Sequence, residues 1–246
     1  GYDRSTTVLT KQLQKEGISI TDFYEADAIP HPYRDSENTL VIYTPAVAAD
    51  NPMLAYFKEE GFECLKRAEV LGLISCEMKT IAVAGTHGKT TVSSMIAYLL
   101  KAGGIKVNGF LGGISRDFGT NLLLDPEAEV MVTEADEYDR SFLQLFPNQL
   151  VITSIDPDHL DIYEDAADLN KTYSQLAAQV DSGGTLFTKP AIIAALDISE
   201  DIQTCTYSLD QKSMIQARNI RVEQGSFIFD YESEDLVLEN VTCGLP

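Results

Sequence analysis

The feature that most constrains the fold of this sequence is a glycine-rich turn between a short apolar run and an amphipathic helical pattern. Residues 81–84 read Ile-Ala-Val-Ala, which is typical of a buried strand in a parallel sheet. Residues 85–91 read Gly-Thr-His-Gly-Lys-Thr-Thr. Apolar side chains then recur at helical spacing and predict one buried helix face, made of Val92, Met95, Ile96, Leu99 and Leu100.

Each part of this turn has a role in phosphate binding. Glycines let the backbone approach an anion, and successive backbone N–H groups at a helix N-terminus attract it. Lys89 supplies a positive charge for the β- and γ-phosphates, and the Thr90 hydroxyl is placed to ligate Mg²⁺. The turn is a shorter variant of the common pattern, because Val83 stands where an earlier glycine is usual. We therefore predict ATP binding by Gly85, Thr86, His87, Gly88, Lys89, Thr90 and Thr91, with His87 equally consistent with merely filling the turn.

A second apolar run ends in a cluster of carboxylates. Residues 129–133 lead into Glu-Ala-Asp-Glu-Tyr-Asp, from 134 to 139. The carboxyl ends of parallel strands are where ligands bind, and several adjacent carboxylates repel one another unless a cation is near. Glu134 is accordingly predicted as a Mg²⁺ ligand, and the other three acids as weaker candidates. A solvated acidic turn is the alternative.

A third apolar run, 151–155, leads into Asp-Pro-Asp-His-Leu-Asp, from 156 to 161. This polar strand end is expected to meet the same site. Chemistry alone favours a surface or hydrogen-bonding role for His159, because Mg²⁺ prefers oxygen ligands.

Alternating strand and helix patterns indicate an α/β protein with a largely parallel sheet. After residue 79 we expect strands at 129–133, 149–154, 185–188 and 203–208, a helix over 168–180, and a small antiparallel addition over 215–242. Before it we expect helices over 5–16, 52–60 and 67–76 and strands at 40–43 and 62–65. A domain boundary near 77–80 separates the two parts.

The composition excludes some partners and indicates a compartment. A net charge of −20 repels nucleic acid and anionic membrane surfaces. The four cysteines are scattered without a Cys-x-x-Cys pair, which favours reduced thiols in a cytoplasm. No run approaches the length of a membrane span, and the first residues do not resemble a signal peptide.

Taken together, the stretches at 85–91, 134–142 and 156–163 resemble the Mur ligase family. The resemblance runs through most of residues 1–165 and is looser beyond. It implies a partial, N-terminally truncated Rossmann-like domain that binds a UDP-sugar (1–78), then a P-loop parallel-sheet ATPase domain (79–246). The third, C-terminal ligase domain of the family is expected to be absent from this chain, which would leave the fragment inactive.

The resemblance also implies a reaction in peptidoglycan precursor synthesis. Within the family, the nearest branch attaches L-alanine to the lactyl carboxylate of UDP-N-acetylmuramate through an acyl phosphate. Lys89, Glu134 and His159 would then be catalytic. One Mg²⁺ would bind Thr90 and Glu134, and a second would bind His159. Arg67 is a candidate contact for the sugar nucleotide, with an ordinary surface arginine as the alternative.

Three other readings stay open. A sister branch attaches a recycled peptide to the same sugar nucleotide, although the segment Leu-Gln-Leu-Phe-Pro at 143–147 favours the alanine-adding branch. Folylpolyglutamate synthase is a more distant relative, and a non-catalytic nucleotide-binding module is a different class. The sequence does not indicate the oligomeric state, a function for 190–246, or the basis of amino-acid choice.

Overall fold

The computed structural model describes residues 1–23, 25–48, 50–156 and 163–244. The chain forms two compact units, Gly1–Val70 and Leu71–Pro246. The division falls within helix α3 (Arg67–Glu77), somewhat before the boundary at 78/79 expected from the sequence. The functions assigned to the two domains stay predictions.

The first unit is built on a two-stranded parallel sheet of β1 (Leu40–Tyr43) and β2 (Glu63–Lys66), joined by helix α2 (Pro52–Glu59). Helix α2 begins where the sequence predicts, because the Asn51 side chain accepts hydrogen bonds from the backbone N–H groups of Met53 and Leu54, both at 3.1 Å. The remaining elements are α1 (Val8–Lys15) and the 3₁₀ turns η1 (Ala26–Ala28) and η2 (His31–Tyr33). Ile29, Phe57 and Phe62 form the core of this unit.

Helix α1 lies where it was expected, but its apolar residues are not buried within the first unit. Val8 is 85% exposed and Leu9 54% exposed, whereas Thr10 is buried. Thr7 and Thr10 bond to each other in a capping box at the start of this helix.

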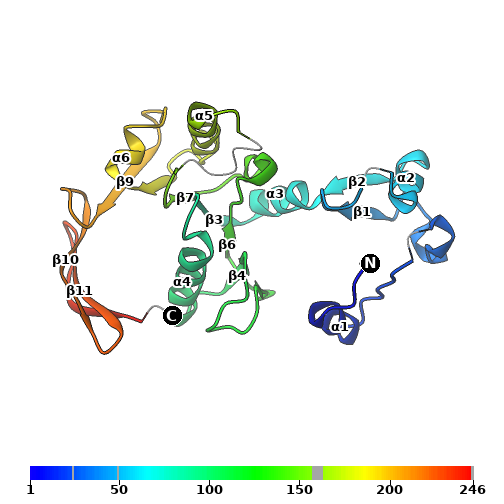
Figure 1. Ribbon diagram of the computed structural model, residues 1–246, viewed down its shortest axis with the longest axis horizontal. Coiled ribbons are helices and arrows are strands. Elements are labelled where there is room, and N and C mark those ends of the chain that lie inside the picture. Colours follow the sequence, from blue (N-terminus) through cyan, green and yellow to red (C-terminus); the bar gives the residue numbers. More distant parts are fainter. Residues whose placement is uncertain (24, 49, 157–162, 245–246) are drawn as a thin grey trace. The chain divides into compact units, whose positions relative to one another are not determined.

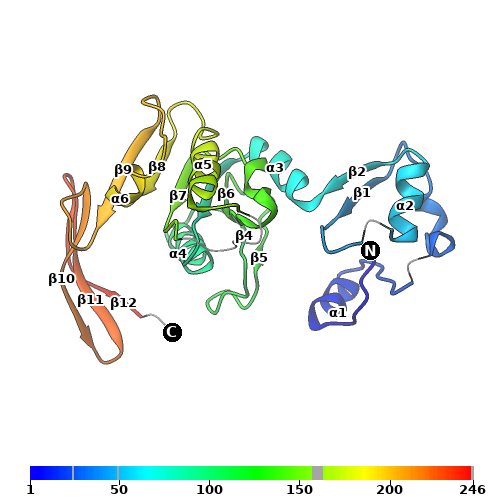
Figure 2. The same ribbon diagram turned by 45° about the horizontal axis from the view of Figure 1, so that its top comes forward.

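A ten-stranded sheet organises the second unit, in the order β12-β11-β10-β9-β8-β7-β3-β6-β4-β5 (Figures 1 and 2). Strands β9, β8, β7, β3, β6 and β4 pair in parallel, β5 is an antiparallel edge, and β10 to β12 form an antiparallel meander. The strands are β3 (Lys79–Ala84), β4 (Val107–Phe110), β5 (Leu122–Leu123), β6 (Val130–Glu134), β7 (Gln149–Ile152), β8 (Thr185–Thr188), β9 (Gln203–Ser208), β10 (Ile215–Glu223), β11 (Ser226–Glu232) and β12 (Val237–Cys243). The predicted parallel sheet and antiparallel addition are confirmed.

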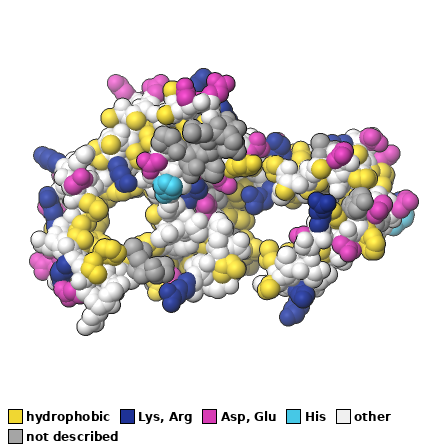
Figure 3. Space-filling model, viewed as in Figure 1, with side chains coloured by type: hydrophobic (Ala, Val, Ile, Leu, Met, Phe, Trp, Pro, Cys, Tyr) yellow, Lys and Arg dark blue, Asp and Glu magenta, His cyan; other side chains and the backbone are white. Residues whose placement is uncertain are grey.

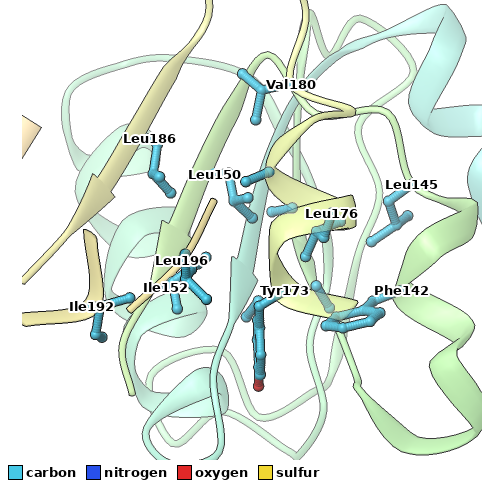
Figure 4. Close-up of a cluster of buried hydrophobic side chains, with 14 of the residues drawn as sticks. Phe142, Leu145, Leu150, Ile152, Tyr173, Leu176, Val180, Leu186, Ile192 and Leu196 are labelled. Carbon is cyan, nitrogen blue, oxygen red and sulfur yellow. The ribbon is translucent and has the colours of Figure 1, made fainter. Parts of the chain in front are cut away.

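Besides the end of α3, the described helices of this unit are α4 (Lys89–Ala102), η3 (Tyr138–Gln144), α5 (Ala166–Ala177) and α6 (Pro190–Ile193). Alternate residues of β3 face opposite sides of the sheet, as the two-residue period of a strand requires. Ala82 and Ala84 join the cluster beneath α5, and Ile81 packs with the cluster beneath α4. Figure 1 shows α4 and α5 on opposite sides of these strands, and Figure 4 shows the α5 cluster.

Helix α5 buries Leu169, Tyr173 and Leu176 at helical spacing, but the buried face of α4 is rotated from the predicted one. Ser93 and Ala97 are fully buried in α4, whereas Met95 is 41% exposed and Leu99 66% exposed. Small side chains at the centre of the contact let α4 approach the sheet closely, so the larger residues are displaced to the rim.

Charged side chains are dispersed over the face of the molecule that Figure 3 draws. Figure 3 shows acidic groups at several places on one face, with basic groups among them. In the part of the chain that the structure describes, no helix combines the length and apolar character needed to cross a bilayer.

Two leucines at helical positions test this packing. Leu176→Ala removes a fully buried side chain of α5 and is expected to lower the free energy of unfolding by about 2–5 kcal/mol. Leu99→Ala changes an exposed residue of α4, and its free energy of unfolding is expected to stay within about 0.5 kcal/mol of that of the parent. Urea denaturation measures both, and an equal loss in the two variants would contradict the observed orientation of α4.

Candidate functional site

The order of the strands brings three polar loops together. Strand β3 lies between β6 and β7, and all three are parallel, so their carboxyl ends share one edge of the sheet. Val83 pairs with Glu134 on β6, and Ala84 pairs with Ile152 on β7. The glycine-rich loop after β3 therefore lies between the acidic segment and the polar end of β7.

Hydrogen bonds attach the glycine-rich loop to the end of β7. The Thr86 and His87 N–H groups donate to the Ser154 carbonyl (3.1 Å) and hydroxyl (2.9 Å). Thr153 donates its N–H to the Ala84 carbonyl at 3.0 Å and its hydroxyl to the His87 carbonyl at 2.5 Å. The Thr86 hydroxyl lies 2.8 Å from the Ser154 hydroxyl, and this hydrogen bond also holds the loop against the end of β7.

Two glycines are required for different reasons. Gly85 has a φ of +127°, and a Cβ there would lie 2.2 Å from the Thr153 Oγ1 and 2.8 Å from the Ser154 nitrogen. Gly88 caps α4 at a φ of +82°, with open space where a Cβ would stand. Gly85 thus permits the close approach to β7, whereas Gly88 permits the left-handed turn into the helix.

The Lys89 ammonium is held at the mouth of the loop by buried groups. Its Nζ donates to the Gly85 carbonyl at 2.8 Å and to both carboxylate oxygens of Glu137 at 2.9 Å. The Glu137 side chain is fully buried and that of Lys89 is 12% exposed. A bidentate contact of this kind fixes the position of the positive charge.

Thr90 and Glu134 form a second contact beside the loop. The Thr90 hydroxyl donates to the Glu134 Oε2 at 2.8 Å, and the Gly112 N–H donates to the same oxygen at 2.9 Å. A Cβ at Gly112 would lie 2.0 Å from that oxygen, so only glycine leaves room for the carboxylate.

These oxygens suit a hard cation such as Mg²⁺. No group of three or more His, Cys, Asp or Glu side chains able to hold a metal occurs among the described residues. Mg²⁺ is commonly bound by one or two protein oxygens together with water and substrate phosphates, and Thr90 and Glu134 supply such a pair.

A clamp from α5 and the residues before it fixes the acidic segment. The Tyr163 hydroxyl donates to the Glu137 carbonyl at 2.6 Å. The Arg140 guanidinium lies 5.3 Å from the centre of the Tyr163 ring and pairs with Asp168 at 2.6 Å. Asp139 and Arg140 have positive φ values of 54° and 52°, a strained conformation that these contacts maintain. Burial, with the nearby charge of Glu137 as the second cause, raises the pKa of Tyr163 to about 12.

A second tyrosine lies beneath the same segment. Tyr173 is fully buried, stacks edge-on against Phe142 and belongs to the cluster in Figure 4. Burial, and then the charge of Glu137, raises the pKa of Tyr173. Its hydroxyl has no hydrogen-bond partner among the described residues.

Of the predicted site residues, the structure brings Gly85, Lys89, Thr90 and Glu134 together. The His87 and Thr91 side chains are exposed. Arg67 is exposed at the start of α3 and belongs to the first unit. His159 lies outside the described residues.

Sequence reasoning missed the partners that hold this group. Glu137 received less weight than Glu134, and no signal in the sequence distinguishes which acid faces the lysine. The sequence places Thr153 and Ser154 only at the end of a strand. Gly112 follows a strand that was not predicted, although its Gly-Gly sequence with residue 113 was a usable signal.

The first unit contains a cavity of its own, of about 910 Å³. It lies beside the end of β1 and the start of α2, and its lining includes Arg4, Thr44, Asp50 and Asn51. Its size is that of a small-molecule site.

Comparisons with known proteins find families and relatives that match this chain. Residues 83–244 match the Mur ligase middle domain, and residues 1–78 match the catalytic domain model of the Mur ligase family. The chain is 42% identical to the UDP-N-acetylmuramate–L-alanine ligases of Christiangramia forsetii and Phocaeicola vulgatus, covering all of this chain and 53% and 54% of those proteins. It thus spans about half the length of the curated relatives that it matches.

Solved structures share the fold. UDP-N-acetylmuramate-alanine ligase from Thermotoga maritima has a TM-score of 0.79 at 25% identity, covering all of this chain and 54% of that one. UDP-N-acetylmuramate:L-alanyl-gamma-D-glutamyl-meso-diaminopimelate ligase from Neisseria meningitides has a TM-score of 0.84 at 21% identity, covering all of this chain and 79% of that one.

Two alanine substitutions separate the roles of the loop glycines. Gly85→Ala introduces a clash with Thr153 and the Ser154 backbone and is expected to detach the loop from β7. Gly88→Ala meets no atom within 4 Å and is expected to cost only backbone strain, about 1–2 kcal/mol. Thermal denaturation and amide exchange of the loop measure the difference. Equal loss of stability and protection in the two variants would argue against the close packing of Gly85.

Proposed function

The chain belongs to the Mur ligase family, and we propose that the protein joins L-alanine to the lactyl carboxylate of UDP-N-acetylmuramate at the expense of ATP. The substrates are those in the names of its relatives in Christiangramia forsetii and Phocaeicola vulgatus. The product would be a precursor of peptidoglycan.

One observation carries the ATP-dependent part of the proposal. Lys89, Thr90 and Glu134 converge at the carboxyl end of β3 and β6, beside a glycine turn that opens helix α4. The backbone N–H groups at the start of α4 provide an anion site, and Lys89 adds a full positive charge. We assign this loop to the phosphates of ATP, with His87 left without a defined role.

The lactyl carboxylate and ATP are both anions, and the site must let them meet. In the proposed reaction a carboxylate oxygen attacks the γ-phosphorus, the bond to the leaving ADP oxygen breaks, and an acyl phosphate results. The amine of L-alanine then attacks the acyl carbon, losing a proton, and inorganic phosphate leaves. Lys89 would stabilise the charge on the transferring phosphoryl group.

Thr90 and Glu134 are the residues that we assign to Mg²⁺. When bound there, the cation would neutralise phosphate charge during transfer. Gly112 would keep the Glu134 carboxylate oriented through its N–H group. A second Mg²⁺ on His159 remains a proposal from the family resemblance.

We assign the sugar nucleotide to the first unit. Its cavity beside β1 and α2 is large enough for a substantial part of such a ligand, and Arg4 at its margin suits a diphosphate. Arg67 remains a candidate contact. The two units would then correspond to the sugar-binding and ATP-binding domains, and the full ligase reaction would require the remaining length that the relatives have.

Phosphate release from ATP by the full-length protein tests this function. We expect release to require both UDP-N-acetylmuramate and L-alanine, and glycine, L-glutamate and a tripeptide are each tested in place of L-alanine. Lys89→Ala should lower the rate at least about a hundredfold, because it removes a charge aimed at the transferring group. Lys101→Ala, at the exposed far end of α4, is the matched control and should be unaffected.

The other outcomes have distinct meanings. Preference for the tripeptide would move the protein to the peptide-recycling branch. ATP binding without release under any substrate combination would favour a non-catalytic nucleotide-binding module.

A further inference from the structure

The Lys89 ammonium can bind two anionic groups, the carboxylate of Glu137 and the phosphates of ATP. In this structure its ammonium is bound by both oxygens of the fully buried Glu137 carboxylate, at 2.9 Å each. A lysine at this position of a phosphate loop serves the β- and γ-phosphates. If ATP binds at this loop, as the proposed function requires, its phosphates compete with Glu137 for the same ammonium.

The Lys89 ammonium and the Glu137 carboxylate differ in how freely they can move. The main chain of Glu137 is anchored, because its carbonyl accepts hydrogen bonds from the Tyr163 hydroxyl at 2.6 Å and the Arg140 N–H at 3.0 Å. The Glu137 side chain is fully buried, so its carboxylate has little room to move. Lys89 has a flexible four-carbon chain and slight exposure at the mouth of the loop. The ammonium can therefore turn toward a phosphate, while the carboxylate stays in place.

A fixed carboxylate at that position has two effects of opposite sign. It keeps the ammonium aimed at the loop when no nucleotide is present. The Glu137 carboxylate also repels the phosphates. Their attraction to Lys89 is reduced because the ammonium must first leave Glu137.

We propose that Glu137 is a positioning residue that holds Lys89 in the nucleotide-free protein and competes with the β- and γ-phosphates for it. Glu137 thereby weakens the binding of ATP and ADP while keeping Lys89 aligned for phosphoryl transfer. Release of product ADP is promoted by the same competition. The proposal rests on the proposed function only in requiring that ATP occupies this loop.

Glu137→Gln in the full-length protein is the decisive change, because it preserves shape and removes the charge. We expect the dissociation constants for Mg-ATP and ADP to fall about tenfold, near the lower end of the contribution of close charge pairs. AMP, which lacks the β- and γ-phosphates, should bind as it does to the parent. The rate constant kcat for phosphate release should fall, because Lys89 is no longer aligned.

Two further variants complete the design. Glu137→Asp keeps the charge on a shorter side chain, so nucleotide affinity should lie between those of the parent and Glu137→Gln, with part of kcat restored. Glu127→Gln removes an exposed carboxylate that pairs with Lys106, and it should change neither the affinity for nucleotide nor kcat.

Thermal denaturation provides a second reading if Glu137→Gln is poorly stable. Without its counter-charge Lys89 is left buried, so the free variant should melt lower than the parent. Added ATP should raise its melting temperature by more than it raises that of the parent, since a tighter ligand stabilises more at equal concentration.

The proposal is overturned if Glu137→Gln binds ATP no more tightly than the parent does, or if ATP and AMP weaken together as a purely structural role predicts. Absence of ATP binding to the parent protein overturns it as well. A parent that binds ATP but forms no amide contradicts the proposed function alone, and the comparison of ATP with AMP then still decides the role of Glu137.

Discussion

The attachment of the glycine-rich loop to the end of β7 is the interaction on which the rest of the site depends. Thr153 and Ser154 satisfy backbone groups of the loop that would otherwise be unpaired at a sheet edge. The contact is so close that Gly85 has no room for a side chain. Because the loop is fixed there, α4 starts at a defined point and presents Lys89 and Thr90 toward β6.

Strand β6 supplies the opposite charge at that point. Glu134 bonds to Thr90 at the end of the strand, and Glu137 bonds to Lys89 from the following turn. Burying a carboxylate is unfavourable unless it is paired, so the Glu137–Lys89 contact and the clamp from Tyr163 and Arg140 depend on one another. The strained turn at Asp139 and Arg140 is stabilised by this arrangement.

Much of this architecture follows from the sequence. Strand β3 and the phosphate loop could be predicted, because an apolar run leads directly into a glycine turn. Helix α5 could be predicted because its apolar residues recur at helical spacing. Strands β4 and β5 could not, since Gly109 interrupts the apolar pattern of β4 and β5 has only two residues. The inward turn of Ser93 and Ala97 in α4 depends on how closely the helix meets the sheet, which the helical spacing alone does not give. The choice of Glu137 as partner of Lys89 depends on how the turn after β6 folds, which composition does not reveal.

A crystal structure of the full-length protein with Mg²⁺ and a non-hydrolysable ATP analogue tests the central claim most directly. The account predicts phosphates cradled by the loop after β3, with the Lys89 Nζ about 3 Å from a β- or γ-phosphate oxygen and the Glu137 carboxylate unmoved. Nucleotide phosphates bound away from this loop, or Lys89 still bonded only to Glu137 with the analogue in place, would contradict it.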